Sequence, residues 1–176
     1  MDRRVRKTRE ALYSAFVALV AERSYDSLSV SDIIGAADVG RTTFYAHFRA
    51  KEDLLAFGFA RLREQLDSVP RTGREPRQAF LAALLAHVKS HAGLFSALVG
   101  GGAGGLAERH FRSIVEDLIA ADIGPGDQHA IMVAMLSGAL LAAIRRWLDT
   151  GTRGSGIEII AAFELLLAAA RQPQAR

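Results

Sequence analysis

The sequence contains no cysteine, only four prolines and a net charge of only +3 over 176 residues. The absence of cysteine excludes disulfide bonds and thiolate chemistry, and it is compatible with a reducing cytoplasm. No segment alternates apolar and polar residues over the length of a strand, and no internal repeat is present. Apolar residues make up 50% of the chain and recur at helical spacing. These features predict an all-α globular protein.

Long apolar runs are also scarce. The longest, residues 130–144, has 15 residues, contains Ser137 and Gly138, and ends at two arginines. A membrane span needs about 20 residues, so we interpret this run as a buried helix and expect no membrane partner. The basic start followed by residues 11–21 resembles a secretion signal, but its apolar residues fall on one helical face, which favours an amphipathic helix over about 5–23.

Signals for catalysis are weak. His87 and His91 lie four apart and could approach a metal with His110 or His129, but the glutamate of a zinc-protease helix is missing between them. No Gly-x-Ser-x-Gly elbow occurs, and the glycine-rich run 100–105 has neither a preceding strand nor a following Lys-Ser/Thr. We therefore expect no metal, no cofactor and no enzyme activity.

Residues 29–48 predict two short helices joined by a tight turn. Ser29 and Asp32 form a capping-box pair at the start of the first helix, and Tyr25 in the turn before it is a candidate buried anchor. Asp38 can adopt a left-handed conformation at its end, and Gly40 precedes a second helix over about 41–48. This arrangement is a helix-turn-helix.

The second helix divides into two faces. Phe44 and Phe48, four residues apart, are expected to face the core. That leaves five residues with polar ends outward, namely Arg41, Thr42, Thr43, Tyr45 and His47. Such groups donate to phosphates and to base edges, whereas the alternative is an ordinary solvated helix face. The first nine residues carry five positive charges and one negative charge, that of Asp2. This basic arm could bind a polyanion, and the alternative is a solvated, frayed terminus.

Four short motifs occur in order: Asp-Ile-Ile at 32–34, Ala-Asp-Val at 37–39, Thr-Phe-Tyr-Ala-His-Phe at 43–48 and Lys-Glu-Asp-Leu-Leu at 51–55. In sequence and spacing they resemble the tetracycline-repressor (TetR) family of bacterial transcription regulators. The resemblance covers about the first third of the chain. Three residues depart from it: Asp38 stands where glycine is usual, Gly40 where serine or threonine is frequent, and Ala50 where a serine commonly caps the next helix. The last departure removes a cap of about 1 kcal/mol, which Glu52 and Asp53 partly offset.

The resemblance implies a homodimeric, sequence-specific DNA-binding regulator in the bacterial cytoplasm, associated with the nucleoid when bound to DNA. It implies a repressor that a small molecule releases from a palindromic double-stranded operator. Arg41, Thr42 and Thr43 would contact bases, while Tyr45, His47 and Lys51 would hold phosphates. Ser29, Ser31 and the basic arm would assist. The rival class is a helical small-molecule-binding or enzymatic protein that has lost DNA binding.

We expect a helix-turn-helix domain over 5–65 and a C-terminal helical regulatory and dimerisation domain over 66–172, with a proline-bounded linker at 70–76. The last two long helices are expected to pair across the dimer axis, and either Phe163 or Leu165 is expected to cross it. The resemblance also implies a cavity for a largely apolar effector. Its candidate lining residues are Phe80, Leu84, His87, Phe95, Phe111, Ile114, Met132 and Met135.

Overall fold

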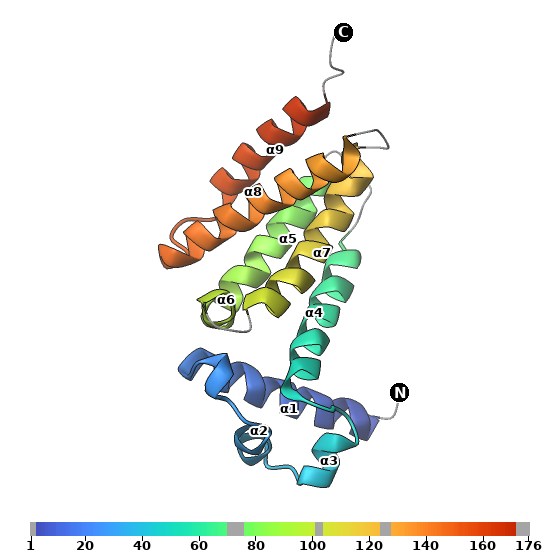
Figure 1. Cartoon of the computed structure of the whole chain (residues 1–176), viewed down its shortest axis with the longest axis vertical. Coiled ribbons are helices and arrows are strands. Elements are labelled where there is room, and N and C mark those ends of the chain that lie inside the picture. The colour runs from blue at the N-terminus through green and yellow to red at the C-terminus, as the bar shows by residue number, and fades with distance from the viewer. Residues whose placement is uncertain (1–2, 70–75, 101–103, 124–127, 172–176) are drawn as a thin grey trace. The chain divides into compact units, whose positions relative to one another are not determined.

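The computed structural model describes residues 3–69, 76–100, 104–123 and 128–171, and these ranges contain helices and no strand (Figure 1). The expected all-α class is therefore confirmed. The chain divides into two compact units, one formed by residues 1–64 and 93–107, the other by 65–92 and 108–176. The predicted functional division between residues 65 and 66 stays a prediction, since compactness does not test function. The linker at 70–76 lies almost wholly outside the described residues.

The first unit contains the helix-turn-helix region. Its elements are α1 (Arg3–Glu22), a short 3-10 helix (Tyr25–Ser27), α2 (Val30–Ala37), α3 (Arg41–Tyr45), most of α4 (Lys51–Asp67) and most of α6 (Ala92–Gly100). Leu12, Phe16 and Val20 bury one face of α1, as their spacing predicts. Ile33 of α2 and Phe44 of α3 are fully buried in the same unit. The apolar face predicted for residues 11–21 is therefore buried within the unit that contains the helix-turn-helix, where α1 contacts α2.

The second unit contains α5 (Pro76–Ser90), most of α7 (Gly104–Ile123), α8 (His129–Asp149) and α9 (Ile157–Arg171). Helices α8 and α9 contact each other and lie side by side in Figure 1. Arg77 of α5 and Glu164 of α9 form a largely buried ion pair, in which Arg77 Nε lies 2.6 Å from Glu164 Oε1. Trp147 of α8 donates from Nε1 to the carbonyl of Arg153, 2.8 Å away, which fastens the α8–α9 loop.

Helix α8 is longer than the apolar run that predicted it. Within the described ranges it is long and apolar enough to cross a membrane by length and composition, and α5 with the start of α6 qualifies only if counted as one broken span. One side of α8 is buried in the second unit through seven residues: Val133, Leu136, Ser137, Leu140, Ile144, Trp147 and Leu148. The expectation of a buried helix therefore holds for this side alone, because the opposite side exposes Ile131 and Met135.

Candidate nucleic-acid interface

The start of α2 is fixed by a reciprocal cap. The Asp32 N–H donates to Ser29 Oγ at 3.2 Å, and the Ser29 N–H donates to Asp32 Oδ2 at 2.9 Å. The predicted capping box is thus confirmed. The hydrogen bonds from Ser29 lower the pKa of the Asp32 carboxyl below its ordinary value, so the carboxylate keeps its charge at the positive end of the helix.

The turn between α2 and α3 takes its left-handed residue at Asp38, with φ 51° and ψ 49°. Asp38 N–H donates to Gly35 O and Val39 N–H donates to Ile34 O, which closes the C-terminus of α2. Gly40 has φ −71°, a conformation open to any residue. The aspartate that replaces the usual glycine therefore adopts the left-handed conformation itself, and Gly40 is not required for it.

Helix α3 ends at Tyr45, three residues earlier than predicted. The Phe48 N–H still donates to Phe44 O at 2.9 Å, but His47 N–H donates to the same carbonyl, also at 2.9 Å. The bond from His47 spans three residues rather than four, so the last turn has the tighter 3-10 geometry and the α-helix ends before it. Phe44 and Phe48 remain buried, as predicted, with ring centroids 6.0 Å apart.

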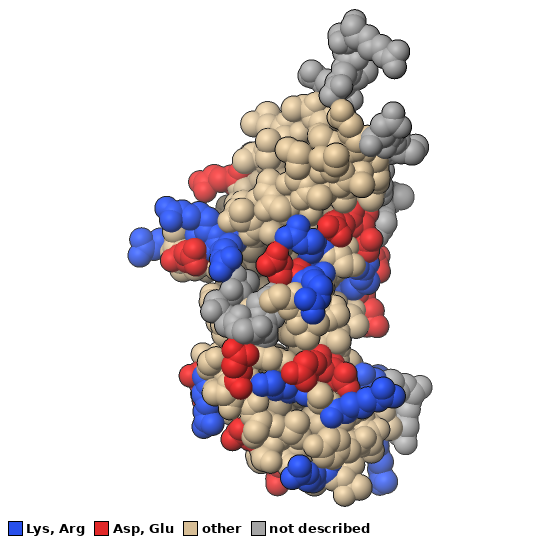
Figure 2. Space-filling view, in the orientation of Figure 1, with Lys and Arg blue, Asp and Glu red and all other residues tan. Residues whose placement is uncertain are grey.

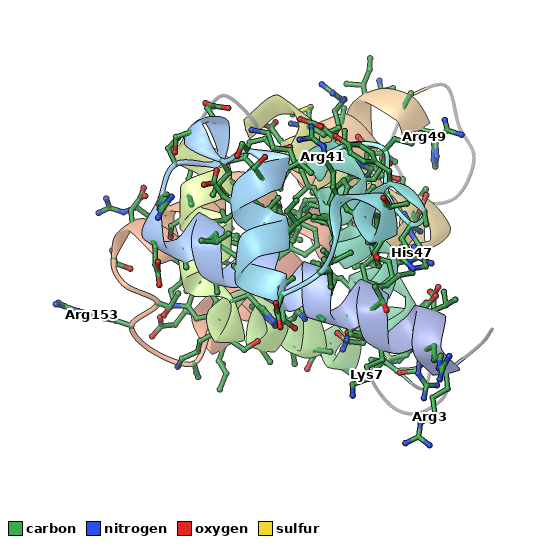
Figure 3. The ribbon with its side chains drawn as sticks, turned by 90° about the horizontal axis from the view of Figure 1, so that it is seen from below. Arg3, Lys7, Arg41, His47, Arg49 and Arg153 are labelled. Atoms are coloured by element: carbon green, nitrogen blue, oxygen red, sulfur yellow. The ribbon has the colours of Figure 1, made fainter. Side chains whose placement is uncertain are left out.

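The predicted base-contacting residues Arg41, Thr42 and Thr43 are all exposed on the first turn of α3. Tyr45 is 49% exposed, and its ring lies 5.8 Å from the Arg41 guanidinium carbon, close enough for a weak cation–π contact. Arg41 and His47 are labelled in Figure 3, which views the chain from below. His47 is half-buried. Ser29 and Ser31 are exposed at the start of α2, with the Ser29 hydroxyl engaged in the cap.

The basic arm belongs to α1 rather than to an extended tail. Arg3 and Lys7 are exposed and project outward near its N-terminus in Figure 3. Arg9 differs: its guanidinium lies 4.4 Å from the Phe57 ring centroid and 5.2 Å from that of Phe48. Its Nε is buried without a hydrogen-bond partner. Arg9 therefore supports the packing of α1 on the end of the helix-turn-helix, a role that its place in a charge run did not indicate.

The Lys51 side chain makes hydrogen bonds within the chain. Its ammonium donates to the carbonyl oxygens of Tyr25 and Leu28, at 2.8 and 2.9 Å, within the chain itself. Asp53 accepts from the Arg49 N–H at 2.7 Å, which fixes the peptide two residues before the start of α4. Ala50 itself offers no side-chain acceptor, in keeping with the predicted loss of one cap.

The profile of "Bacterial regulatory proteins, tetR family" matches residues 10–56, from the second turn of α1 into α4. The helix-turn-helix region, over the matched residues, belongs to the tetR family. The N-terminal part of the chain is 46% identical over 56 residues to the uncharacterized HTH-type transcriptional regulator YxbF of Bacillus subtilis (strain 168), covering 31% of this chain and 15% of that protein.

Two other proteins resemble this chain, one in the sequence of the N-terminal segment and one in fold. The segment is 38% identical over 52 residues to the HTH-type dhaKLM operon transcriptional activator DhaS of Lactococcus lactis subsp. lactis (strain IL1403), covering 30% of this chain and 28% of DhaS. The match thus spans less than a third of these curated relatives' lengths. A TetR transcriptional regulator from Streptococcus agalactiae 2603V shares the fold, with a TM-score of 0.73, 24% identity and 97% of each chain covered.

The predicted effector residues are divided between the two compact units. Phe80, Leu84, Phe111 and Ile114 are buried in the second unit, where His87 and Met132 are half-buried. Phe95 belongs to the first unit, where its ring and that of Phe59 are nearly perpendicular, with centroids 6.4 Å apart. Met135 is 65% exposed. Helical spacing showed that Phe95 and Met135 lie on apolar faces, but it did not show that Phe95 belongs to the first unit or that Met135 is exposed.

His87 on α5 and His91, which directly follows α5, form a stacked contact. The ring centroids lie 4.3 Å apart, and His91 Nδ1 lies 2.8 Å from Ser90 Oγ. Over the described ranges no group of three or more His, Cys, Asp or Glu residues lies close enough to hold a metal ion. Burial, with help from Arg109, lowers the pKa of His110, so this imidazole tends to be neutral.

Proposed function

We propose that the chain is a sequence-specific DNA-binding transcriptional regulator, a homodimeric repressor that a small, largely apolar molecule releases from a palindromic operator. The observation that carries the DNA-binding part is the capped helix-turn-helix, in which buried Phe44 fixes α3 while Arg41, Thr42 and Thr43 face outward. Base contacts specify and phosphate contacts position. Arg41, Thr42 and Thr43 would contact bases, and Tyr45, His47, Ser29, Ser31, Arg3 and Lys7 would lie along the phosphates.

Arg41→Ala is expected to relax the preference among operator variants by about 1–3 kcal/mol, because a bidentate arginine–guanine contact distinguishes that base from the others. An operator is first selected from random duplexes, and binding to single-base variants is measured by fluorescence anisotropy. The control is Lys7→Ala, which should weaken all sequences alike and lower the salt slope by about one. Equal losses on every sequence for Arg41→Ala would remove Arg41 from base recognition.

The rival proposal is a helical small-molecule-binding or enzymatic protein that has lost DNA binding. It shares the second unit with the first proposal and differs in the helix-turn-helix. Salt-dependent binding of the wild-type chain to duplex DNA favours the regulator, since phosphate neutralisation makes such binding fall steeply with salt. Absence of binding at low salt favours the rival. For a regulator we place the chain in the cytoplasm and, when bound, on the nucleoid.

A dimer is proposed because one short recognition helix contacts too few base pairs to be selective, whereas a two-fold protein matches a palindrome. The second unit offers a matching surface, the α8–α9 face, defined by the exposed residues Ile131, Met135, Ile157, Leu165 and Leu166. The one other exposed large hydrophobic side chain among the described residues is Tyr45. Exposed alanines at 130, 134, 139 and 142 on α8 would let a second helix approach closely. Figure 2 shows few charges over the N-terminal half of α8, whereas charges gather at its C-terminal end.

The effector part of the proposal rests on the second unit, since a helix-turn-helix of about 50 residues does not need a hundred more to fold. Phe80, Leu84, Phe111 and Ile114 offer apolar surface, and half-buried His87 offers one polar anchor. Helix α4 is continuous and contributes residues to both units, so it is the proposed link. A shift of α4 would change the spacing of the two recognition helices, which must match about one DNA turn, 34–36 Å.

A ligand found by thermal stabilisation in a screen of apolar metabolites and drugs is expected to weaken operator binding by about 1–3 kcal/mol. By reciprocity, operator DNA should weaken ligand binding by the same factor. Both effects are measured by titrating the protein with operator in the presence of saturating ligand, and with ligand in the presence of saturating operator. The relative DhaS is named an activator, so a ligand that strengthens operator binding would reverse the proposed sign. A stabilising compound that leaves operator affinity unchanged would refute the coupling.

A further inference from the structure

Lys51 makes more contacts within the first unit than a DNA-contacting lysine needs. Its Nζ lies 2.8 Å from Tyr25 O, 2.9 Å from Leu28 O and 3.4 Å from Asp26 O, and 4.4 Å from the Tyr25 ring centroid. An ammonium carries three N–H donors and no acceptor. The three carbonyls and the ring face therefore already surround its charge, and a phosphate oxygen would have to displace one of them.

These carbonyls belong to one short segment, residues 24–28, which we call the Tyr25 turn. Leu28 directly precedes Ser29, the N-cap of α2, so a hydrogen bond to Leu28 O fixes the peptide that enters the capping box. The Tyr25 side chain is only 4% exposed, and its hydroxyl donates to Glu52 Oε1 at 3.1 Å. Burial and the neighbouring Glu52 raise the pKa of Tyr25, so the hydroxyl keeps the proton that it donates.

The position of Lys51 in α4 also indicates that the carbonyls of the Tyr25 turn are what stabilises its charge. Lys51 is the first residue of α4, where the positive end of the helix dipole disfavours a cation. Glu52 and Asp53, which follow it, have the charge that this helix end favours. The carbonyls of the Tyr25 turn supply the negative potential that a cation at this position otherwise lacks. Lys51 and Glu52 together tie α4 to the segment that leads into α2.

We propose that Lys51 is a positioning residue, which holds the Tyr25 turn and thereby sets where α2, and α3 after it, are presented to DNA. It acts without contacting a phosphate, in contrast to the role that the family resemblance implies. The proposal deepens the DNA-binding function proposed above and rests on it for its effect on affinity. The clamp itself, from Nζ to Tyr25 O and Leu28 O, is a property of the free protein.

The test is Lys51→Met, which removes the ammonium and keeps an unbranched apolar stem that is favourable in a helix. The matched control is Lys7→Met, since Lys7 is exposed on α1. Binding to a labelled random-sequence duplex and to the selected operator is measured over a range of salt, well below the unfolding temperature and corrected for the folded fraction. Amide hydrogen exchange is measured on the free proteins.

For Lys51→Met we expect affinity to fall on the order of tenfold on both duplexes, which is about 1.4 kcal/mol, with the salt slope unchanged. Exchange of the Asp32 and Ile33 amides, which donate to Ser29, should quicken, while exchange within α1 should not. For Lys7→Met we expect the slope to fall by about one, with α2 exchange unchanged.

Two outcomes would overturn the proposal. A salt slope lowered by about one in Lys51→Met, with α2 exchange unchanged, would make Lys51 a phosphate ligand. A lower unfolding temperature with unchanged affinity of the folded protein would make it a structural residue without a positioning role. If the wild-type chain binds no duplex, the DNA-binding function fails instead, and the exchange measurement still tests the clamp on the free protein.

Discussion

Leu165→Asp is expected to convert the proposed dimer into a folded monomer. Leu165 is 73% exposed within one chain and lies on the α8–α9 face, so its replacement does not disturb the interior of the second unit. In a two-fold interface the substitution occurs twice. If burying each carboxylate costs about 3 kcal/mol, the dissociation constant rises by about 10⁴-fold. Sedimentation velocity at micromolar concentration measures the change, and circular dichroism checks that helix content is kept.

Two controls separate dissociation from unfolding. Phe163 lies two residues away on α9 but is only 2% exposed, so Phe163→Asp places a charge in the interior and should lose helix content. Ala82→Asp adds the same charge at an exposed alanine of α5 and should leave the dimer intact. A Leu165→Asp protein that still sediments as a dimer would place the interface elsewhere. A wild-type monomer at this concentration would refute the dimer altogether.

The dimer also enters operator affinity directly. In a dimer the two recognition helices contact two half-sites, and the unfavourable entropy of association is incurred only once. A monomer contacts only one half-site. The Leu165→Asp monomer should therefore lose most of its preference for the operator over random duplex, even though Arg41, Thr42 and Thr43 are untouched. Its salt slope should fall toward half the wild-type value, because about half as many phosphates are contacted by each bound species.

The sequence predicts the helix-turn-helix well because its determinants are local. Ser29 and Asp32 are three residues apart, and Asp38 follows the last residue of α2, so caps and turn are determined by neighbours. Phe44 and Phe48 share a face by helical period alone and are both buried. The exception is the end of α3, where the hydrogen bond from His47 N–H to Phe44 O, across three residues, ends the helix before the predicted Phe48. Such competition between nearly equal bonds is not visible in a hydrophobic pattern.

The roles of Lys51, Arg9 and Arg77 could not be predicted because their partners are distant in the chain. Lys51 meets Leu28, 23 residues away, and Arg77 meets Glu164, 87 residues away. A charged residue in a run or at a helix end gives no sign of such a partner. The same holds for Phe163 and Leu165: periodicity separates two faces of α9, but the packing on α5 and α8 decides which face is inside.

Gly156→Ala is expected to destabilise the second unit by about 2–4 kcal/mol, from left-handed strain of about 1–2 kcal/mol and crowding of a filled site. Gly156 has φ +77° and precedes α9. An added Cβ would lie 2.9 Å from Leu85 Cδ1 and 3.6 Å from the Trp147 ring. The loop cannot easily move away, because Trp147 Nε1 holds Arg153 O at 2.8 Å and Lys89 Nζ holds Gly154 O at 3.1 Å.

Gly151→Ala is the matched control, since Gly151 has φ +73° in the same loop and no neighbouring heavy atom within 4 Å of its added Cβ. It should show the backbone strain alone, about 1–2 kcal/mol, so the difference between the two variants measures the contact with Leu85 and Trp147. Thermal unfolding reports both, at about 2–4 °C per kcal/mol for a chain of this size. Equal shifts would mean that the Leu85 side chain turns aside at no cost. A larger shift for Gly156→Ala, together with weaker dimerisation, would show that this docked loop sets the position of α9 and hence of Leu165.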